Sequence, residues 1–367
     1  MRKKNSSLKI LFFMPNKKNN LNGVSRVGYL LSKIIIHKRN ISVNEYFINL
    51  NTKRELKKIL NIFKYLFIPF FNKKFKNANI IFSTTSRLPI LGLDKRIYKI
   101  IFIHDLVYKK LPKTMNFFNF LSDCLLVPNA IRRADLILCP SNSTFNDIKE
   151  NFPKYINKTH IIPLASSLEN ISDIEKNYNI PKKYLLCVGT IEPRKNYSKI
   201  LKAYSILSEK IRKEFPLIIV GKKGWGNIDI KKQIKDLKLS NNIFLKQNIS
   251  DNHLKVLYKK SFCLIYVSLF EGFGLPIIEA HTFRIPTIVS RNSSMPEVEG
   301  EGAIYVNPYS ERSIYIALRK VILNKKFRKY LSEKAFLNSQ KYSWSKSSKK
   351  LNNLLTTKLD NYFNQIS

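Results

Sequence analysis

Cysteine and histidine are scarce in this chain of 367 residues, and neither is arranged as a binding site. Each of the four cysteines lies in an apolar run and none forms a Cys-x-x-Cys pair: Cys124, Cys139, Cys187 and Cys263. This usage excludes a disulfide framework and a thiolate zinc site, and it indicates small core residues in a reduced compartment. The five histidines show no metal-ligand spacing: His37, His104, His160, His253 and His281.

Two short ligand-binding motifs are also missing. The chain has no Asp-x-Asp pair, so we expect no metal ion held by such a pair. No Gly-x-Gly-x-x-Gly follows the first predicted strand, so a nicotinamide cofactor is not indicated. The sequence therefore predicts neither a metal site nor a cofactor.

Long apolar runs are absent, because no stretch reaches the ~18 residues that a membrane-spanning helix needs. The N-terminal MRKKNSSLKILFFMPNKK has a basic start and an apolar run at 10–15. That run is shorter than a signal-peptide core and has no small-residue cleavage site, so we expect a first buried strand. We expect the protein to be cytoplasmic.

Acidic residues are few: 25 Asp and Glu face 65 Lys and Arg, for a net charge of +40. A field this positive attracts phosphates, anionic lipid surfaces and nucleic acid, and it says nothing about fold. No RNP-like, helix-turn-helix or zinc-finger pattern accompanies the charge, so no specific nucleic-acid partner is expected.

Short apolar runs alternate with segments of helical periodicity along the whole chain. We predict six strands in the first half, at 8–14, 42–48, 79–83, 99–103, 135–139 and 160–164. Six more are predicted in the second half, at 184–188, 217–220, 243–245, 262–267, 287–290 and 303–306. The longer helical segments lie at 24–37, 197–210, 275–283 and 344–363. This alternation predicts an α/β protein with two Rossmann-like domains, divided by the polar stretch 166–179.

Ligands of open α/β sheets bind beyond the carboxyl ends of the strands, so residues that follow strands are the candidates for a site. Gly23 follows the first strand and precedes a helix, where a glycine lets the backbone approach an anion. The alternative is an ordinary turn. His104 and Asp105 end the strand at 99–103, where the histidine can contact a sugar hydroxyl and the acid can orient it. The alternative is a structural histidine.

A pair of adjacent cations follows the first strand of the second half, in the sequence GTIEPRKN. Arg194 offers a planar fork and Lys195 a point charge, and together they can neutralise a diphosphate beside a helix start. The alternative is a solvated charge pair, which the position after a strand end disfavours.

The most specific motif is EGFGLPIIEA, which runs from a glycine loop into a helix. Pro276 suits the first turn of that helix, and the glycines free the backbone to turn its N–H groups onto a ligand. Glu271 lies before the helix and Glu279 inside it, so the two carboxylates can meet opposite ends of one ligand and accept bonds from vicinal hydroxyls. The alternative is a capping glutamate followed by a surface glutamate.

EGFGLPIIEA, with GTIEPRKN upstream, resembles the retaining GT-B glycosyltransferases, in particular glycosyltransferase family 4. The resemblance covers nearly the whole chain and is strongest at 184–308, where SSMPEVEGEGAIYVNP also matches. It implies two Rossmann-like domains facing across a cleft. Residues 1–168 would form the acceptor domain, 169–180 a linker, 181–343 the nucleotide-sugar donor domain, and 344–367 a C-terminal helix that returns to the first domain.

The resemblance also implies roles for the matching residues of the donor domain. Glu271 would bind the transferred sugar near the reacting centre, and Glu279 would bind the ribose hydroxyls. Arg194 and Lys195 would hold the diphosphate.

Further contacts are implied for the glycine loop and the first domain. The N–H groups of Phe273, Gly274 and Leu275 would serve the sugar and the phosphate. Gly23 would approach the diphosphate from the facing domain, and His104 would touch the donor sugar, which places it with Glu271 among the catalytic residues.

The implied function is the retaining, metal-independent transfer of a hexose from a GDP- or UDP-sugar, with GDP-mannose as one candidate. The acceptor would be a lipid-linked oligosaccharide in surface polysaccharide synthesis. Two alternatives stay open: a nucleotide-sugar epimerase of the same fold, and a non-catalytic basic nucleic-acid-binding protein.

Three positions depart from the family pattern. Arg284 stands where a glycine is usual, and a glycine there can adopt the left-handed helix end. Glu299 replaces a small residue, and Asn22 precedes Gly23 where paired glycines are common.

The basic segment 54–77 carries apolar residues at helical spacing, including Phe63 and Phe67, with Lys57 and Lys64 off that stripe. Pro69 should end or kink this helix. A basic amphipathic helix can lie on an anionic membrane, so we expect a peripheral position on the inner face of the cell membrane. The alternative is an ordinary helix that covers the sheet.

Overall fold

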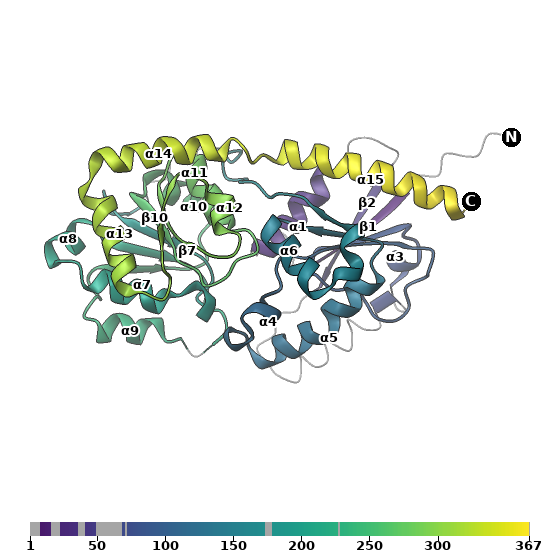
Figure 1. Ribbon diagram of the computed structural model, residues 1–367, viewed down its shortest axis with the longest axis horizontal. Helices are drawn as coiled ribbons and strands as arrows, with labels where there is room; N and C mark the ends of the chain where they lie inside the picture. The colour runs from purple at the N-terminus through teal and green to yellow at the C-terminus, as the bar shows by residue number, and fades with distance from the viewer. Residues whose placement is uncertain are drawn as a thin grey trace. The chain divides into compact units, whose positions relative to one another are not determined.

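The structure is a computed structural model that describes residues 8–15, 23–35, 41–48, 68–69, 72–172, 178–226 and 228–366. The chain divides into two compact units (Figure 1). The first consists of Met1–Leu106, Phe118–Leu164 and Trp344–Ser367, and the second of Val107–Phe117 and Ala165–Ser343. Each unit is built around one six-stranded parallel sheet.

The sheet of the first unit has the strand order β2-β1-β3-β4-β5-β6. Its strands are β1 (Leu8–Pro15), β2 (Ile41–Ile48), β3 (Ile80–Ser83), β4 (Tyr98–Phe102), β5 (Leu136–Cys139) and β6 (Thr159–Ile161). Every residue of β3, β4 and β5 is buried. Continuous apolar runs of this kind are what a parallel sheet covered on both faces requires.

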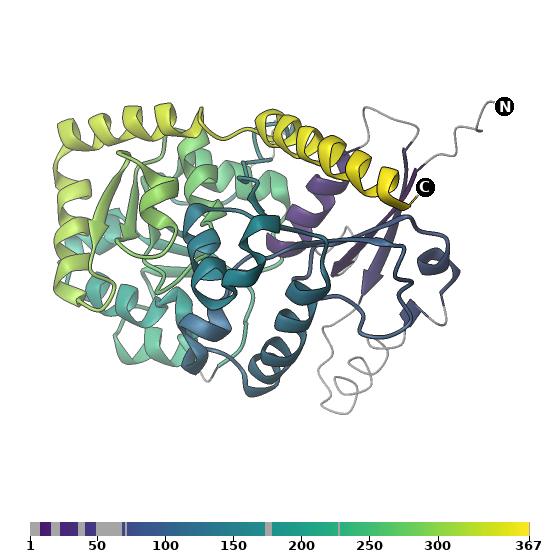
Figure 2. The ribbon, with the colours of Figure 1, turned by 45° about the vertical axis from the view of Figure 1, so that its right-hand side comes forward.

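The longest helix of the first unit packs on the shorter helix that follows the first strand. The helices are α1 (Gly23–Ile34), α3 (Lys73–Lys76), α5 (Phe117–Arg133), α6 (Asn142–Asn151) and α15 (Trp344–Ile366). The side chains of Ser348 and Asn352 donate to the Ile34 carbonyl at 3.1 and 3.0 Å. These bonds hold α15 along α1, as Figure 2 shows.

The sheet of the second unit has the order β12-β11-β10-β7-β8-β9. Its strands are β7 (Leu185–Val188), β8 (Leu217–Val220), β9 (Ile243–Lys246), β10 (Cys263–Tyr266), β11 (Thr287–Ser290) and β12 (Ala303–Val306). Because β7 and β10 are adjacent in the middle of the sheet, the loops that follow them meet at one edge.

Helices cover both faces of this second sheet. The helices of this unit are α4 (Val107–Lys110), α7 (Tyr197–Ser205), α8 (Glu209–Glu214), α9 (Ile230–Asp236), α10 (Asp251–Lys260), α11 (Leu275–Thr282), α12 (Met295–Glu299), α13 (Glu311–Leu323) and α14 (Lys325–Ser339). Figure 1 shows α7, α9 and α13 on one face and α10 and α11 on the other.

The predicted fold class is confirmed, since all twelve predicted strands form two parallel sheets of six. The single helix predicted over 197–210 is wrong, because α7 ends at Ser205 and α8 begins at Glu209. The division into units also differs from the predicted ranges at 107–117 and 165–168, which group with the second unit rather than the first.

Two predictions fall where little of the chain is described. Asn22 lies outside the described residues, and the segment 54–77 is described only at 68–69 and 72–77. Among the described residues, no helix combines the length and the hydropathy needed to cross a membrane.

Candidate functional site

The loop after β7 presents the two predicted cations on one turn. This turn is the 3-10 helix η4 (Pro193–Lys195), and Asn196 ends it in the left-handed conformation with a φ of 60°. The Asn196 side chain donates to the Pro308 carbonyl at 2.7 Å. Because the turn is anchored at its end, Arg194 and Lys195 keep fixed positions at the edge of the sheet.

The glycine loop after β10 is fixed by hydrogen bonds with Ser293 and Ser294. The N–H of Glu271 donates to Ser293 Oγ at 3.0 Å, and the Ser294 hydroxyl lies 2.9 Å from the carbonyls of both Glu271 and Phe273. Gly274 has a φ of +98°, which favours glycine, and it turns the chain into α11. The loop therefore points Glu271 toward the loop that follows β7.

The two loops meet in an ion-pair cluster made of Glu192, Arg194, Lys195, Tyr266 and Glu271. Arg194 Nη1 lies 2.8 Å from Glu271 Oε2, and Lys195 Nζ lies 2.5 Å from Glu271 Oε1. Arg194 Nε lies 2.6 Å from Glu192 Oε1, and Lys195 Nζ donates to the Tyr266 hydroxyl at 2.8 Å. The cations are thus not a solvated pair, because both are bound to carboxylates.

Burial and charge act against each other in this cluster. Burial alone would raise the pKa of Glu271, but Arg194 and Lys195 outweigh it and lower that pKa to about 2. Burial lowers the pKa of Lys195, although Glu271 opposes the shift. Burial raises the pKa of Glu192 above its ordinary value, against the pull of Arg194 and Lys195. Glu271 is therefore firmly ionised, whereas Glu192 is the carboxylate that takes up a proton more readily.

Glu279 lies in α11 and is only 3% exposed. Its Oε2 accepts a hydrogen bond of 2.8 Å from the hydroxyl of Tyr258 in α10. Glu271 is buried as well, so the interpretation of the motif as a capping and a surface glutamate is wrong.

The other residues of the glycine loop are packed in different ways. Phe273 is buried, and its ring meets that of Tyr342 edge-on with centroids 5.7 Å apart. Leu275 is the first residue of α11 and is half-buried.

His104 and Gly23 belong to the first unit. The His104 Nε2 donates to the Thr84 carbonyl at 2.9 Å, so Nδ1 is the acceptor nitrogen of the ring. Burial lowers the pKa of His104, which favours this neutral form. Gly23 begins α1, and a Cβ there would meet no atom of the described residues within 4 Å, so packing against them does not require a glycine.

The structure explains two of the departures from the family pattern. Arg284 has the left-handed φ of 61° expected of the usual glycine, and its guanidinium lies 3.7 Å from the Phe336 ring centroid. Glu299 is fully buried, and its Oε1 lies 2.8 Å from Nε2 of His281, which is also fully buried. The unusual glutamate thus has a partner in the helix that carries Glu279.

Three residues that contact the predicted site residues were not singled out from the sequence: Glu192, Tyr258 and Tyr266. Glu192 was visible inside GTIEPRKN as an acid two residues before Arg194. The two tyrosines carry no such signal, because they resemble ordinary core residues.

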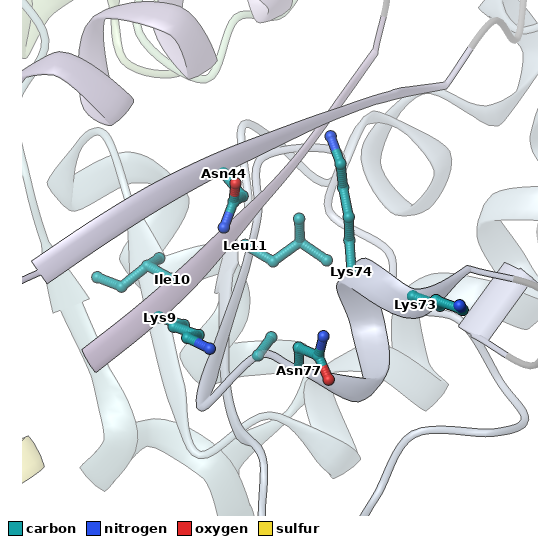
Figure 3. Close-up of a pocket in the computed structure, with 8 residues that line it drawn as sticks. Lys9, Ile10, Leu11, Asn44, Lys73, Lys74 and Asn77 are labelled. Atoms are coloured by element: carbon teal, nitrogen blue, oxygen red, sulfur yellow. The ribbon is translucent and has the colours of Figure 1, made fainter. Parts of the chain in front are cut away.

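The described residues show no metal-ligand cluster, and the cavity described in the first unit includes none of the predicted site residues. Within the part of the chain that the structure describes, no three His, Cys, Asp or Glu side chains are grouped to hold a metal ion. A cavity of about 200 Å³ in the first unit is lined by Lys9, Ile10, Leu11, Asn44, Lys73, Lys74, Asn77 and Ala78 (Figure 3). It adjoins the first half of β1, away from the carboxyl ends of the strands, and includes none of the predicted site residues.

Comparison with known proteins places this site in a family. The profile described as "Glycosyl transferases group 1" matches residues 170–337. The O-antigen chain mannosyltransferase B of Escherichia coli is 30% identical over 161 residues, which are 44% of this chain and 42% of the relative. The O-antigen chain mannosyltransferase RfbU of Salmonella typhimurium is 28% identical over 251 residues, which are 68% of this chain and 66% of the relative. The chain thus spans less than half of the first relative's length.

One solved structure shows how far the fold likeness extends. Anabaena Alr3699/HepE in complex with UDP-glucose has a TM-score of 0.70 and 15% identity, and the match covers 95% of this chain and 100% of that chain. Residues 170–337, which hold the whole ion-pair cluster, therefore belong to the glycosyl transferases of group 1, and the chain that carries them has the GT-B fold.

Proposed function

We propose that this protein is a glycosyltransferase that moves a hexose from a nucleotide sugar onto a surface polysaccharide. The observation that carries the proposal is the ion-pair cluster, where two cations and Glu271 converge after β7 and β10. The cluster lies in the segment that matches the family profile. The O-antigen mannosyltransferases among the relatives make GDP-mannose the first donor to test.

The cations suit the leaving group of this reaction. Negative charge develops on the diphosphate as its bond to the sugar breaks, and Arg194 and Lys195 stabilise that charge from fixed positions without a metal ion. The N–H groups of Phe273, Gly274 and Leu275 add the positive end of α11. In this proposal the reaction needs no cofactor.

The two glutamates divide the rest of the donor between them. Glu271 is ionised and lies beside the cations, so its carboxylate accepts hydrogen bonds from hydroxyl groups of the transferred sugar. Glu279 lies farther along α11 and binds the ribose. From the first unit, we assign His104 to the donor sugar through its acceptor Nδ1, and Gly23 to the diphosphate.

The proposed transfer retains the anomeric configuration of the sugar, and the acceptor is a growing lipid-linked glycan. The test incubates the purified protein with GDP-mannose or UDP-glucose and a polyprenyl-linked acceptor, with Arg194→Ala as the inactive control. NMR of the product should show the anomeric configuration of the donor. Conversion of the donor sugar without acceptor would identify an epimerase instead. Salt-dependent nucleic-acid binding without nucleotide-sugar binding would identify the third alternative.

We also propose that the cytoplasmic protein works at the inner, anionic membrane surface. Its net charge is +40, and α5 exposes Phe118, Leu121 and Leu125 by 40%, 44% and 64% at helical spacing. Co-sedimentation with vesicles should rise with anionic lipid and fall with salt. The double variant Leu121→Ser, Leu125→Ser should bind less than Ile316→Ser, which changes a 53% exposed side chain of α13. Equal binding to neutral and anionic vesicles would refute the electrostatic part.

A further inference from the structure

The ion-pair cluster is electrically balanced before any ligand arrives. Arg194 and Lys195 face Glu192 and Glu271, so two cations meet two carboxylates. The side chains of these four residues are only 15%, 10%, 2% and 7% exposed, in that order. A nucleotide sugar adds the negative charges of both phosphates to this buried site. An uncompensated buried charge is strongly unfavourable, so binding must change the charge of the cluster or break one of its ion pairs.

Arg194 is the residue for which the incoming phosphates and the two carboxylates compete. Its Nε is engaged by Glu192 at 2.6 Å and its Nη1 by Glu271 at 2.8 Å. The planar fork that would bind a phosphate is thus already occupied on two sides by carboxylates. A phosphate oxygen can take over the guanidinium if one of these carboxylates loses its negative charge.

The two carboxylates are not equivalent. Glu271 is contacted by both cations, at 2.8 Å by Arg194 and at 2.5 Å by Lys195. Glu192 has Arg194 as its ion-pair partner, and burial favours its neutral form. A Cβ placed on Gly224 would lie 3.2 Å from the Cβ of Glu192, so the loop after β8 packs against the base of this side chain. The Glu192 side chain is only 2% exposed, so an ionised carboxylate there is unfavourable once Arg194 leaves it.

Charged and titratable groups face Glu192 from every element packed against it. Arg194 and Lys195 lie on the same turn, Glu271 on the loop after β10, and Tyr197 in α7. Lys222 and Lys223 lie on the loop after β8, where both are exposed.

We propose that Glu192 is a positioning residue that orients Arg194 in the free enzyme and takes up one proton when the donor diphosphate binds. The proton comes from bulk solvent and is added to a carboxylate oxygen of Glu192, and no other covalent bond changes. This inference rests on the proposed function. Since the complex holds one proton more than the free enzyme, the association constant rises as pH falls, by at most about tenfold per pH unit.

The test is calorimetry of GDP-mannose and UDP-glucose at pH 7 in two buffers of different ionisation enthalpy. Nucleotide sugars are the right probes, because a free terminal phosphate has a second pKa of about 6 and would itself exchange protons. The wild type should take up a net proton on binding, and its affinity should fall as pH rises. Glu192→Gln should bind without proton uptake and with an affinity that no longer depends on pH. The control Glu311→Gln changes a carboxylate paired with Lys199 outside the cluster and should behave like the wild type.

Each outcome decides the matter. Binding by the wild type without proton uptake would overturn the inference and leave the proposed function standing. Proton uptake that persists in Glu192→Gln would place the proton elsewhere and overturn it too. If Glu192→Gln does not fold, difference infrared spectroscopy of the wild type decides, since a protonated-carboxyl band must appear on binding and its absence refutes the inference. If no nucleotide sugar binds at all, the proposed function fails and the inference fails with it.

Discussion

The buried pair of His281 and Glu299 should couple α11 to the elements around it, and the coupling can be measured. Glu299 Oε1 lies 2.8 Å from His281 Nε2, and its Oε2 accepts from the Thr287 hydroxyl at 2.7 Å. The Asn338 amide donates to the Val298 carbonyl at 2.7 Å and lies 3.2 Å from His281 Nδ1. Nδ1 is then the acceptor of the ring, and Nε2 carries the hydrogen and faces Glu299 Oε1.

Replacing either partner by Ala leaves a buried polar atom of the other unsatisfied. Glu299→Ala and His281→Ala should therefore each lower the free energy of unfolding by about 3–5 kcal/mol. The double variant should cost less than the sum, with an interaction term of about 2 kcal/mol. Glu299→Gln is the matched control, because the Thr287 hydroxyl can turn to accept from the new amide. It exchanges charged for neutral hydrogen bonds and should cost about 1 kcal/mol.

The assay is urea denaturation followed by tryptophan fluorescence. The chain has two tryptophans, of which Trp225 lies in the second unit and Trp344 in the first. A Trp344→Phe background therefore reports on the unit that contains the pair. Additive effects of the two Ala variants within about 0.5 kcal/mol would refute the reasoning. A Glu299→Gln variant as unstable as Glu299→Ala would refute the proposed hydrogen-bond pattern.

Three further predictions concern the donor site. Arg194→Ala or Lys195→Ala should weaken binding of nucleoside diphosphates by about 1.5–3 kcal/mol in calorimetry, and unchanged affinity in the folded double variant would exclude a diphosphate role. Turnover should survive excess EDTA, and a loss that magnesium or manganese restores would contradict metal-independent transfer. Glu271→Gln should mainly lower kcat, because its contacts tighten as the sugar gains charge, whereas Glu279→Gln should mainly raise the donor KM. Donor-saturation kinetics separate the two effects, and the opposite pattern would reverse the assignment of the carboxylates.

The sequence alone was sufficient to predict the twelve strands and their division into two sheets. Buried parallel strands are near-continuous apolar runs, so their positions can be read locally, as in β8, β10 and β11. The motif residues Arg194, Lys195 and Glu271 could be singled out because each follows a predicted strand, and Glu279 because it lies in the helix that the glycine loop leads into. Positions of this kind depend on chain order, which the sequence contains.

Only the tertiary structure decided which of these residues touch. Arg194 and Glu271 are 77 residues apart in the chain, and they meet because β7 and β10 pair in the sheet. The same pairing brings Tyr266 to Lys195, although a tyrosine in an apolar strand carries no local sign of that contact. Glu192 is part of the recognised motif GTIEPRKN, but its role depends on the position of the Arg194 side chain in the folded protein.

The departures from the family pattern also show that the sequence does not reveal which residues are in contact. Glu299 was recognised as unusual from the sequence, and its partner His281 was not, because the two are joined only by the packing of α11 against α12. The strands can be located from the sequence because each one is a short run of apolar residues. The charge balance of the site is determined by contacts between loops distant in the chain, and those contacts exist only once the sheet has formed.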